Sequence, residues 1–553
     1  MSQSGGLGIA VIEYARQLGL GLSSFVSVGN KADLSGNDLL EYWEQDAATE
    51  VILLYLESFG NPRRFARIAP RVAAGKPILA VKSGRSAAGA RAAGSHTGAL
   101  LAASDVTVDA LFEQAGVIRA DTLGELFDVA ALLAGQPLPA GPSIAILTNA
   151  GGPGILAADA CAAHGLEVPR LSEPTQHALR AFASPEAALA NPVDLIAGAS
   201  AEDFARALHV LVDDPDVDAV VTIFVPPLVT RGEDVARAIA DAAAAAAETE
   251  RPTPVLSVFM TADASFQALR DARAPVYPFP EDAIRALGRA AWYGRWRAMP
   301  REGPPSLEAV RPFEAAAVIA GALTRGGGWL EPGELAALCD CYRLPVADSR
   351  AAPTVEAAVD AARDLGGPVA LKAVAPGLVH KTEAGGVRLG LRGPRVVRRA
   401  AQEMRAQVIR AGHAAPSFLV QRMAGPGVEM LVGVVHDPQF GPVLACGAGG
   451  TAVELVHDVA VRITPLAERD AHDMVRSLAT FPLLDGYRGA PRADVGALED
   501  VLLRISALVE AHPQVAELEC NPVVVTPDGA TVVDIRARVC EVAPEAPSPS
   551  VRR

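Results

Sequence analysis

Two histidines stand in loops of small residues, where an imidazole could take up a phosphoryl group and pass it on. His96 is flanked by Ser95 and Thr97 in a Gly- and Ala-rich run, and His380 stands between a Pro-Gly turn and a Gly-Gly pair. An imidazole in such a loop is accessible from several sides, which suits nucleophilic catalysis. A polar loop or cap histidine is the ordinary alternative for His96. Glu57, at the end of an expected strand, could orient the His96 ring, or it could be a surface carboxylate.

A short run of small residues opens the chain and could bind phosphate. Ser4, Gly5 and Gly6 precede an amphipathic helix expected over residues 9–18. Backbone N–H groups at a helix start lie at the positive end of its dipole, which suits an anion. A tight turn with glycines for packing alone explains the loop equally well. Such loops normally leave the carboxyl end of a strand, so we expect the chain to begin in mid-fold.

Lysine is rare here, with only five among the 49 Lys and Arg residues. Lys372 and Lys381 fall within ten residues of each other. Lys372 occupies an otherwise apolar strand expected over residues 369–374, where a charge is costly unless it meets an anion or a counter-ion. A nucleotide phosphate would satisfy it, and a strand-end lysine that reaches solvent is the alternative.

Oxygen-bearing side chains alternate near the end of the chain. In an extended segment Glu519 and Asn521 point to the same side, and Asp534 from the neighbouring strand could join them. Two carboxylates and an amide suit Mg²⁺ bound together with nucleotide phosphates. A hairpin with a polar, solvated face is the competing interpretation.

The elements that must position these residues form three groups along the chain. Short β-rich runs alternate with Ala- and Leu-rich helices over residues 1–137 and again over 142–300, the pattern of parallel sheets covered by helices. Residues 310–540 differ, because several of their β-rich runs are close enough to form antiparallel ribbons, which favours an α+β domain. A Pro- and Ser-rich tail over 541–553 is expected to be disordered. The fold class is therefore α/β multidomain.

Composition excludes several classes of protein. Half of the 553 residues are apolar and a fifth are charged, as in soluble globular proteins. The net charge of −15 argues against a nucleic-acid partner. No apolar run approaches the roughly 20 residues of a membrane-spanning helix, and no secretory signal opens the chain. Six cysteines without a CxxC pair favour a reducing cytoplasm.

Taken together, these segments resemble the nucleoside-diphosphate-forming acyl-CoA synthetases, relatives of succinyl-CoA synthetase in which both subunits are fused into one chain. The resemblance covers the chain from residue 1 to the start of the Pro- and Ser-rich tail. It implies two flavodoxin-like domains followed by an ATP-grasp domain. The implied reaction is reversible and converts a carboxylic acid, CoA and ATP into acyl-CoA, ADP and phosphate.

The resemblance implies a role for each candidate residue. His96 would be the phosphorylated histidine, supported by Glu57, and His380 a second, mobile histidine that ferries phosphate between distant ATP and CoA sites. The remaining residues fall into three implied sets: Ser4, Gly5, Gly6, Gly151 and Gly152 for phosphate; Lys372, Gln421, Met423 and Glu429 for ATP; and Glu519, Asn521 and Asp534 for Mg²⁺.

The sequence departs from the family at its start. Family members of the fused type begin with a CoA-binding Rossmann-like domain that nothing here matches. We therefore expect a start assigned too late, a truncated gene, or a separate polypeptide that supplies CoA binding. The main alternative function is a truncated or regulatory ATP-binding protein that needs a separate CoA-binding subunit for activity. A carboxylate–amine ligase of the ATP-grasp type would leave His96 without a purpose. Related enzymes assemble as dimers of the unit equivalent to this chain, so a homo-oligomer is expected.

Overall fold

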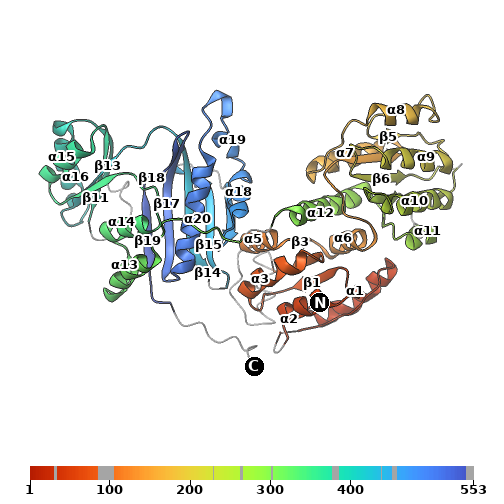
Figure 1. The fold of residues 1–553 in the computed structure, drawn as a ribbon, viewed down its shortest axis with the longest axis horizontal. Helices are drawn as coiled ribbons and strands as arrows, with labels where there is room; N and C mark the ends of the chain where they lie inside the picture. Colours follow the sequence, from red (N-terminus) through yellow and green to blue (C-terminus); the bar gives the residue numbers. More distant parts are fainter. Residues whose placement is uncertain are drawn as a thin grey trace. The chain divides into compact units, whose positions relative to one another are not determined.

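The structure is a computed structural model that describes residues 1–29, 31, 34–84, 105–227, 230–261, 266–300, 303–375, 385–437, 439–450 and 458–542. It divides into two compact units, Met1–Pro300 and the described residues that follow (Figure 1), and each is considered by itself. The predicted disordered tail lies, from residue 543 on, outside the described residues. No helix within the described ranges is long and apolar enough to cross a membrane.

The first sheet is parallel and has five segments. Its full strands are β1 (Ile52–Leu56), β2 (Ile78–Lys82) and β3 (Val117–Arg119), in that order. Ser2 extends the sheet, because it forms parallel bridges with both Tyr55 and Ser27. The spatial order is therefore residues 25–28, residues 1–3, β1, β2, β3. Numbered along the chain this is 2-1-3-4-5, the flavodoxin-like order, in which ligands bind at the carboxyl ends beside the first strand.

Helices cover this sheet, and side chains cap the starts of α3 and α6. The side chain of Asn61 accepts from the backbone of Arg64 at the start of α3, and Thr122 caps α6 in the same way. The helices are α1 (Gly5–Gln17), α2 (Gly36–Gln45), α3 (Pro62–Ala73), α5 (Asp105–Ala115) and α6 (Leu123–Gly135).

The start of α1 corrects one expectation. The helix predicted from residue 9 begins at Gly5, with Ser4 as the residue before it. The glycines are therefore part of the first helical turns and do not form a separate loop. A packing reason accounts for one of them: a Cβ on Gly8 would lie 2.6 Å from the ring of Phe25. Small residues let this end of α1 lie close to the neighbouring strand segment.

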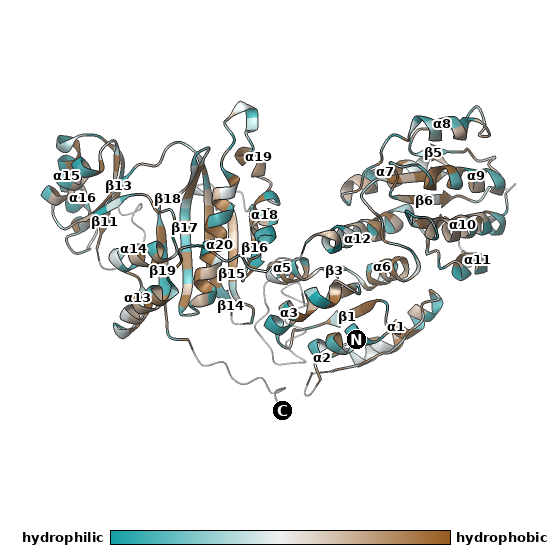
Figure 2. Ribbon diagram, viewed as in Figure 1, coloured by the Kyte–Doolittle hydropathy of each residue, from teal (hydrophilic) through white to brown (hydrophobic). Residues whose placement is uncertain are grey.

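The second sheet repeats the same topology. Its order is β5-β4-β6-β7-β8 and all its pairs are parallel, so the chain again follows 2-1-3-4-5. Every residue of β4, β6 and β7 is buried, which Figure 2 shows as hydrophobic strands between more polar helices. The strands are β4 (Ile144–Thr148), β5 (Val193–Asp194), β6 (Ala219–Phe224), β7 (Val255–Phe259) and β8 (Val276–Tyr277). The helices are α7 (Gly151–Ala163), α8 (Glu173–Arg180), α9 (Ala201–Val212), α10 (Gly232–Ala247), α11 (Gln267–Asp271) and α12 (Pro280–Ala298).

Helix α12 joins the two sheets into one unit. It packs against both α6 and α7. Arg289 forms an ion pair of 3.0 Å with the buried Glu125, and the hydroxyl of Tyr293 donates a hydrogen bond of 2.5 Å to the carbonyl of Ala73. These contacts give the two sheets a shared helical layer.

The second unit contains two antiparallel sheets. The smaller has the order β10-β13-β11-β12, with α15 (Val355–Leu365) and α16 (Pro394–Arg410) packed on one face. Its strands are β10 (Ser349–Ala352), β11 (Val369–Val374), β12 (Val387–Leu391) and β13 (Ser417–Arg422). The larger has the order β16-β15-β14-β17-β19-β9, with β18 paired to β17. Its strands are β9 (Gly328–Trp329), β14 (Val428–Asp437), β15 (Gly441–Ala448), β16 (Val459–Ile463), β17 (Val515–Thr526), β18 (Gly529–Val532) and β19 (Ile535–Val539).

The other elements of the second unit are α13 (Pro312–Thr324), α14 (Pro332–Cys341), α18 (Glu468–Arg476), α19 (Phe481–Leu484), a short 3-10 turn (Tyr487–Gly489) and α20 (Val495–Ala511). The helices α13, α14, α18 and α20 supply apolar residues to the core on the larger sheet. The predicted class of two parallel α/β sheets followed by an antiparallel α+β part is confirmed.

Candidate functional site

The structure brings some predicted site residues together and leaves two unplaced. His96 and His380 both lie outside the described residues. The other candidates lie at three places: the carboxyl edge of the first sheet, the same edge of the second sheet, and the space between the two antiparallel sheets of the second unit.

At the carboxyl edge of the first sheet, Gln3 connects Glu57 to the start of α1. The Gln3 side chain is 7% exposed. Its Oε1 accepts from the backbone N–H groups of Glu57, at 2.5 Å, and Ser58, at 3.0 Å, and its Nε2 donates to the Ser58 carbonyl at 2.9 Å. Ser4 follows directly and begins α1 without a side-chain cap. The predicted phosphate loop and the half-buried Glu57 therefore lie at one sheet edge.

Two lysines that sequence reasoning did not single out lie at the same edge. Nζ of Lys31 donates to the carbonyl and the hydroxyl of Ser58, at 2.6 and 2.9 Å. The pKa of Lys31 is lowered to about 8, mainly by burial and also by the charge of Lys82, while Glu57 opposes both effects. Burial also lowers the pKa of Lys82, the last residue of β2. Lysine is rare in this chain, and these two lie at or just after the ends of expected strands. These two features together could have identified the pair from the sequence.

The second glycine loop is an open helix start. Gly151 and Gly152 are exposed at the beginning of α7, directly after β4. A Cβ on Gly152 would meet no atom within 4 Å, whereas one on Gly151 would lie 3.3 Å from Oδ2 of Asp194. The first turn of α7 thus presents accessible N–H groups beside one carboxylate.

In the second unit, Lys372 and Gln421 share a face of the smaller sheet. Val369, Leu371 and Ala373 of β11 lie in the core under the helices, so Lys372 points to the opposite side. Gln421, on the adjacent strand β13, pairs with Ala370, which is two residues from Lys372 on β11. Gln421 therefore lies on the same side of the sheet as Lys372. Both residues are buried, at 5% and 3% exposed over the whole residue. Oε1 of Gln421 has no hydrogen-bond partner among the residues that the structure describes.

Lys372 reaches across to the larger sheet. Its Nζ donates to Oδ1 of Asp534 at 3.0 Å and to the carbonyl of Val533 at 2.8 Å. The sequence did not predict this partner, because it depends on how the two sheets pack. Met423, just past β13, is half-buried and donates its backbone N–H to the carbonyl of Pro368.

The three predicted metal ligands adjoin one another. Asn521 donates its backbone N–H to the carbonyl of Asp534 at 3.0 Å, and Glu519 pairs with Arg536 across the strands. Nη2 of Arg536 lies 2.5 Å from Oε2 of Glu519, and Oδ1 of Asn521 accepts from the backbone of Gly450 at 3.1 Å. Two carboxylates and an amide oxygen are ligands of the kind that Mg²⁺ takes. In this structure their oxygens contact Arg536, Lys372 and the backbone of Gly450, so an ion would replace some of these contacts.

A glycine loop after β15 closes against Glu429. The backbone of Gly449 donates to the Glu429 carbonyl at 2.8 Å. A Cβ on Gly450, whose φ is +71°, would overlap Oε2 of Glu429. The loop can lie this close to Glu429 and Asn521 only because it lacks side chains.

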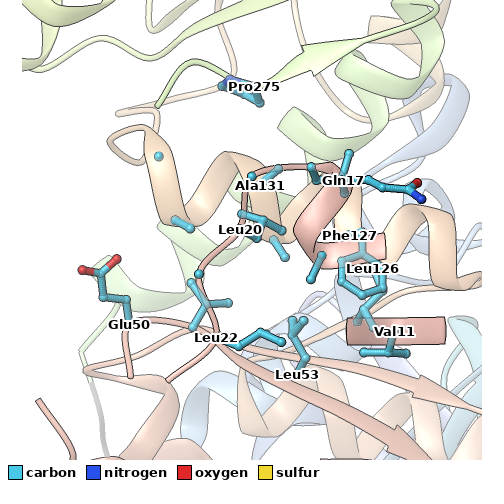
Figure 3. A pocket seen from close by; sticks show the side chains of 18 of the residues that line it. Val11, Gln17, Leu20, Leu22, Glu50, Leu53, Leu126, Phe127, Ala131 and Pro275 are labelled. Carbon is cyan, nitrogen blue, oxygen red and sulfur yellow. The ribbon is translucent and has the colours of Figure 1, made fainter. Parts of the chain in front are cut away.

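A cavity of about 830 Å³ lies at the opposite, amino-terminal end of the first sheet (Figure 3). Leu22, Leu53 and Phe127 line it, together with Pro275 at the start of β8. The Met1 amine donates to the Leu53 carbonyl at 2.8 Å, and burial lowers its pKa to about 5. None of the predicted site residues lines this cavity. Its lining is largely apolar, with Glu50, Arg270 and Arg273 as charged residues.

Family models match three successive parts of the chain. They are a succinyl-CoA ligase like flavodoxin domain over residues 1–133, a Ligase-CoA domain over 144–298, and an ATP-grasp domain over 321–539.

Named relatives match nearly the whole chain. The ADP-forming acetate–CoA ligase I of Archaeoglobus fulgidus is 40% identical over 541 residues, which cover 97% of this chain and 77% of the relative. The ADP-forming 4-hydroxybutyrate–CoA ligase of Nitrosopumilus maritimus is 32% identical, with the same coverage. A solved structure of acetyl-coenzyme A synthetase 1 from Ca. Korarchaeum cryptofilum, in complex with phosphate and ADP, is 36% identical with a TM-score of 0.49, covering 54% of this chain and 64% of that one. This chain belongs to the ADP-forming acyl-CoA synthetases.

Proposed function

We propose that this acyl-CoA synthetase moves the γ-phosphoryl group of ATP to its acid substrate through two histidines, His380 and then His96. The observation that carries the proposal is that groups suited to hold phosphate occur in both compact units. In one, Lys372 stands beside the carboxylate and amide group of Glu519, Asn521 and Asp534. In the other, Glu57 stands beside the start of α1. A covalent carrier lets one phosphoryl group serve two separate sites.

In the second unit, the residues on the facing sheets would hold the nucleotide. Lys372 would bind its phosphates, and Gln421, Met423 and Glu429 would contact the rest of the molecule. The buried Oε1 of Gln421, which has no donor within the described part of the chain, supports this assignment, because such an acceptor is costly unless a ligand donates to it. Mg²⁺, when bound by Glu519, Asn521 and Asp534, would neutralise charge on the phosphates.

The reaction through His96 then proceeds in successive steps. A nitrogen of His380 attacks the γ-phosphorus and ADP leaves; the phosphoryl group passes to His96, which Glu57 orients. A carboxylate oxygen of the acid attacks phospho-His96 to form an acyl phosphate. The CoA thiol loses its proton and attacks the acyl carbon, and inorganic phosphate leaves. The N–H groups of Ser4, Gly5, Gly6, Gly151 and Gly152 would hold the phosphoryl oxygens.

The acid is proposed to be a small carboxylic acid, since relatives use acetate and 4-hydroxybutyrate. A homo-oligomer and a cytoplasmic location complete the proposal. All six cysteines are free thiols in the structure and five of them are buried, which suits a reducing compartment.

Phosphohistidine labelling tests the relay. ATP radiolabelled at the γ-phosphate, with Mg²⁺, should give an acid-labile, base-stable phosphoprotein, and His96→Ala should abolish the final label. His380→Ala should lose labelling from ATP but keep labelling from an acyl phosphate. Full labelling by both routes in His380→Ala would show that the two-histidine relay is wrong.

A second experiment addresses the alternative, an ATP-binding protein that needs a separate CoA-binding subunit. The Pyrococcus furiosus relatives divide the enzyme into alpha and beta subunits, so related parts do occur on separate chains. CoA-dependent ADP formation should be measured with the chain alone and with an added CoA-binding fragment. Turnover only with the fragment favours the alternative, and turnover by the chain alone excludes it.

A further inference from the structure

The two lysines at the carboxyl edge of the first sheet have no role in the proposal above. Lys31 follows the strand segment that pairs with Ser2, and Lys82 ends β2. Both are half-buried. Their positions lie on either side of Glu57, which follows β1, so three of the five segments of the sheet each contribute one charged side chain to a single edge.

The hydrogen bonds of Lys31 hold it at that edge. Its Nζ contacts both the carbonyl and the hydroxyl of Ser58, and Ser58 is in turn held by Gln3. An ammonium group carries three donors, and these contacts account for two. Lys82 donates to the neighbouring carbonyl of Ser83 at 2.6 Å.

The charges at this edge are unevenly matched. Lys31 and Lys82 repel each other, and Glu57 is the carboxylate that favours the charged form of both. Asp105 also favours charged Lys82, but it forms a salt bridge of 2.5 Å with Arg119, and Asp109 binds the same guanidinium. Among the residues that the structure describes, these two half-buried ammonium groups thus share Glu57 as the carboxylate outside an ion pair, an arrangement that an added anion would stabilise.

Lys76 shows what a structural lysine looks like in the same domain. Its Nζ donates to the carbonyls of Trp43 and Asp46, both at 2.6 Å, and it lies just before β2, at the other end of the strand. These carbonyls belong to the end of α2 and the residue after it, where a cation complements the helix dipole.

We propose that Lys31 and Lys82 bind the phosphate of the reaction, placing its oxygens between Glu57 and the first turn of α1. The inference rests on the proposed function, because it assumes that phosphate binds at this edge of the sheet during the reaction. It adds two cationic phosphate-binding residues to a site otherwise built from backbone N–H groups. Because the two cations lie on either side of Glu57, they would hold a dianion beside that carboxylate.

Inorganic phosphate is the probe for the test, with binding to the full chain measured by isothermal titration calorimetry. We expect Lys31→Met and Lys82→Met each to weaken phosphate binding by about 10- to 100-fold, the loss of one charge-assisted hydrogen bond. Lys76→Met is the matched control and should bind phosphate within about twofold of wild type. Wild-type affinity should fall as Lys31 loses its proton above about pH 8, and Lys31→Arg, which keeps its charge, should move that fall to higher pH.

Two results would overturn the inference: wild-type affinity in both methionine variants, or no measurable phosphate binding by the wild type at millimolar concentration. If a methionine variant does not fold, the wild-type pH profile and Lys31→Arg decide. Labelling of His96 by ATP tests the proposed function separately. A chain that forms phosphohistidine but binds phosphate equally well without these lysines refutes this inference alone.

Discussion

Nζ of Lys372 lies 3.0 Å from Oδ1 of Asp534, so a strand of the smaller antiparallel sheet is tied to the turn before β19 of the larger one. The lysine is 7% exposed at its side chain and the aspartate 48%. A buried charge needs such a partner. The residue proposed for nucleotide phosphate and a residue proposed for Mg²⁺ are therefore already neighbours, which is the arrangement that a metal–nucleotide complex requires.

Replacing Lys372 by Met should abolish phosphohistidine formation from ATP and weaken ATP binding by about 100-fold, because the phosphates lose their cation. The fold should tolerate the change, since methionine retains most of the apolar stem and Asp534 can be hydrated. Binding of a fluorescent ATP analogue and a thermal melt measure the two effects. Wild-type ATP affinity in this variant would contradict the assignment.

Asp534→Asn should raise the Mg²⁺ concentration needed for half-maximal labelling by about tenfold or more, since a neutral amide binds a hard cation less well. A Mg²⁺ titration of the labelling rate gives this value. Asp528→Asn, an exposed aspartate in the nearby β17–β18 turn, is the control and should leave the titration unchanged. Equal shifts in both variants would point to general surface charge.

Gln421→Met should have opposite effects on stability and binding. The change removes a buried Oε1 that accepts from none of the described residues, so the free energy of unfolding should rise by about 1 kcal/mol. ATP affinity should fall, because the same oxygen is proposed to accept from the nucleotide. Urea unfolding and ATP titration are the measurements. A destabilised variant that keeps its ATP affinity would assign Gln421 a purely structural role.

Gly6→Ala and Gly8→Ala should separate phosphate binding from packing in α1. A Cβ on Gly6 meets no atom within 4 Å, so alanine should stabilise the helix by up to about 1 kcal/mol and keep the backbone N–H groups. A Cβ on Gly8 meets the Phe25 ring and should cost about 1–3 kcal/mol. Chemical denaturation tests both. Equal stability in the two variants would show that α1 does not lie against Phe25.

Asp128 should make stability depend on pH. Its pKa is raised to about 6, mainly by burial and also by the charge of Asp282, while Arg285 opposes the rise. The folded protein thus holds this proton more tightly than the unfolded chain, whose carboxyl titrates near 3.8. The stability that this proton contributes is therefore full below about pH 3.8 and is lost as pH rises through about 6.

In Asp128→Asn the difference in melting temperature between pH 5 and pH 7.5 should therefore become smaller than in wild type. A scan of melting temperature against pH for both proteins measures this. An unchanged difference would mean that other groups govern the pH dependence.

The sequence predicted the sheets and which side chains share a face of a strand. It did not predict the contacts between elements that are distant in the chain. Alternation along β17 predicted that Glu519 and Asn521 point the same way, and the strand pairing brings Asp534 beside Asn521. The Lys372–Asp534 contact spans 162 residues and depends on the packing of two sheets. No local pattern encodes such a contact.

The carboxyl edge of the first sheet illustrates the same limit. Gln3, Lys31, Glu57 and Lys82 adjoin because the strand order is 2-1-3-4-5. Only Glu57 was identified, since its place after a strand suggested a role for it, whereas Lys31 and Lys82 lacked a motif. The start of α1 was placed four residues late because glycines favour loops on propensity alone, and here close packing against Phe25 outweighs that preference.

The distribution of lysine also makes this chain suited to chemical footprinting. The described lysines are Lys31, Lys76, Lys82 and Lys372, and each has a different surrounding. With a pKa of about 8, Lys31 presents a neutral, reactive amine at mildly alkaline pH, whereas Lys372 is shielded in the second unit. Mass spectrometry after brief acylation would thus report protection of Lys31 by phosphate and of Lys372 by nucleotide as separate peptides, without any engineered probe.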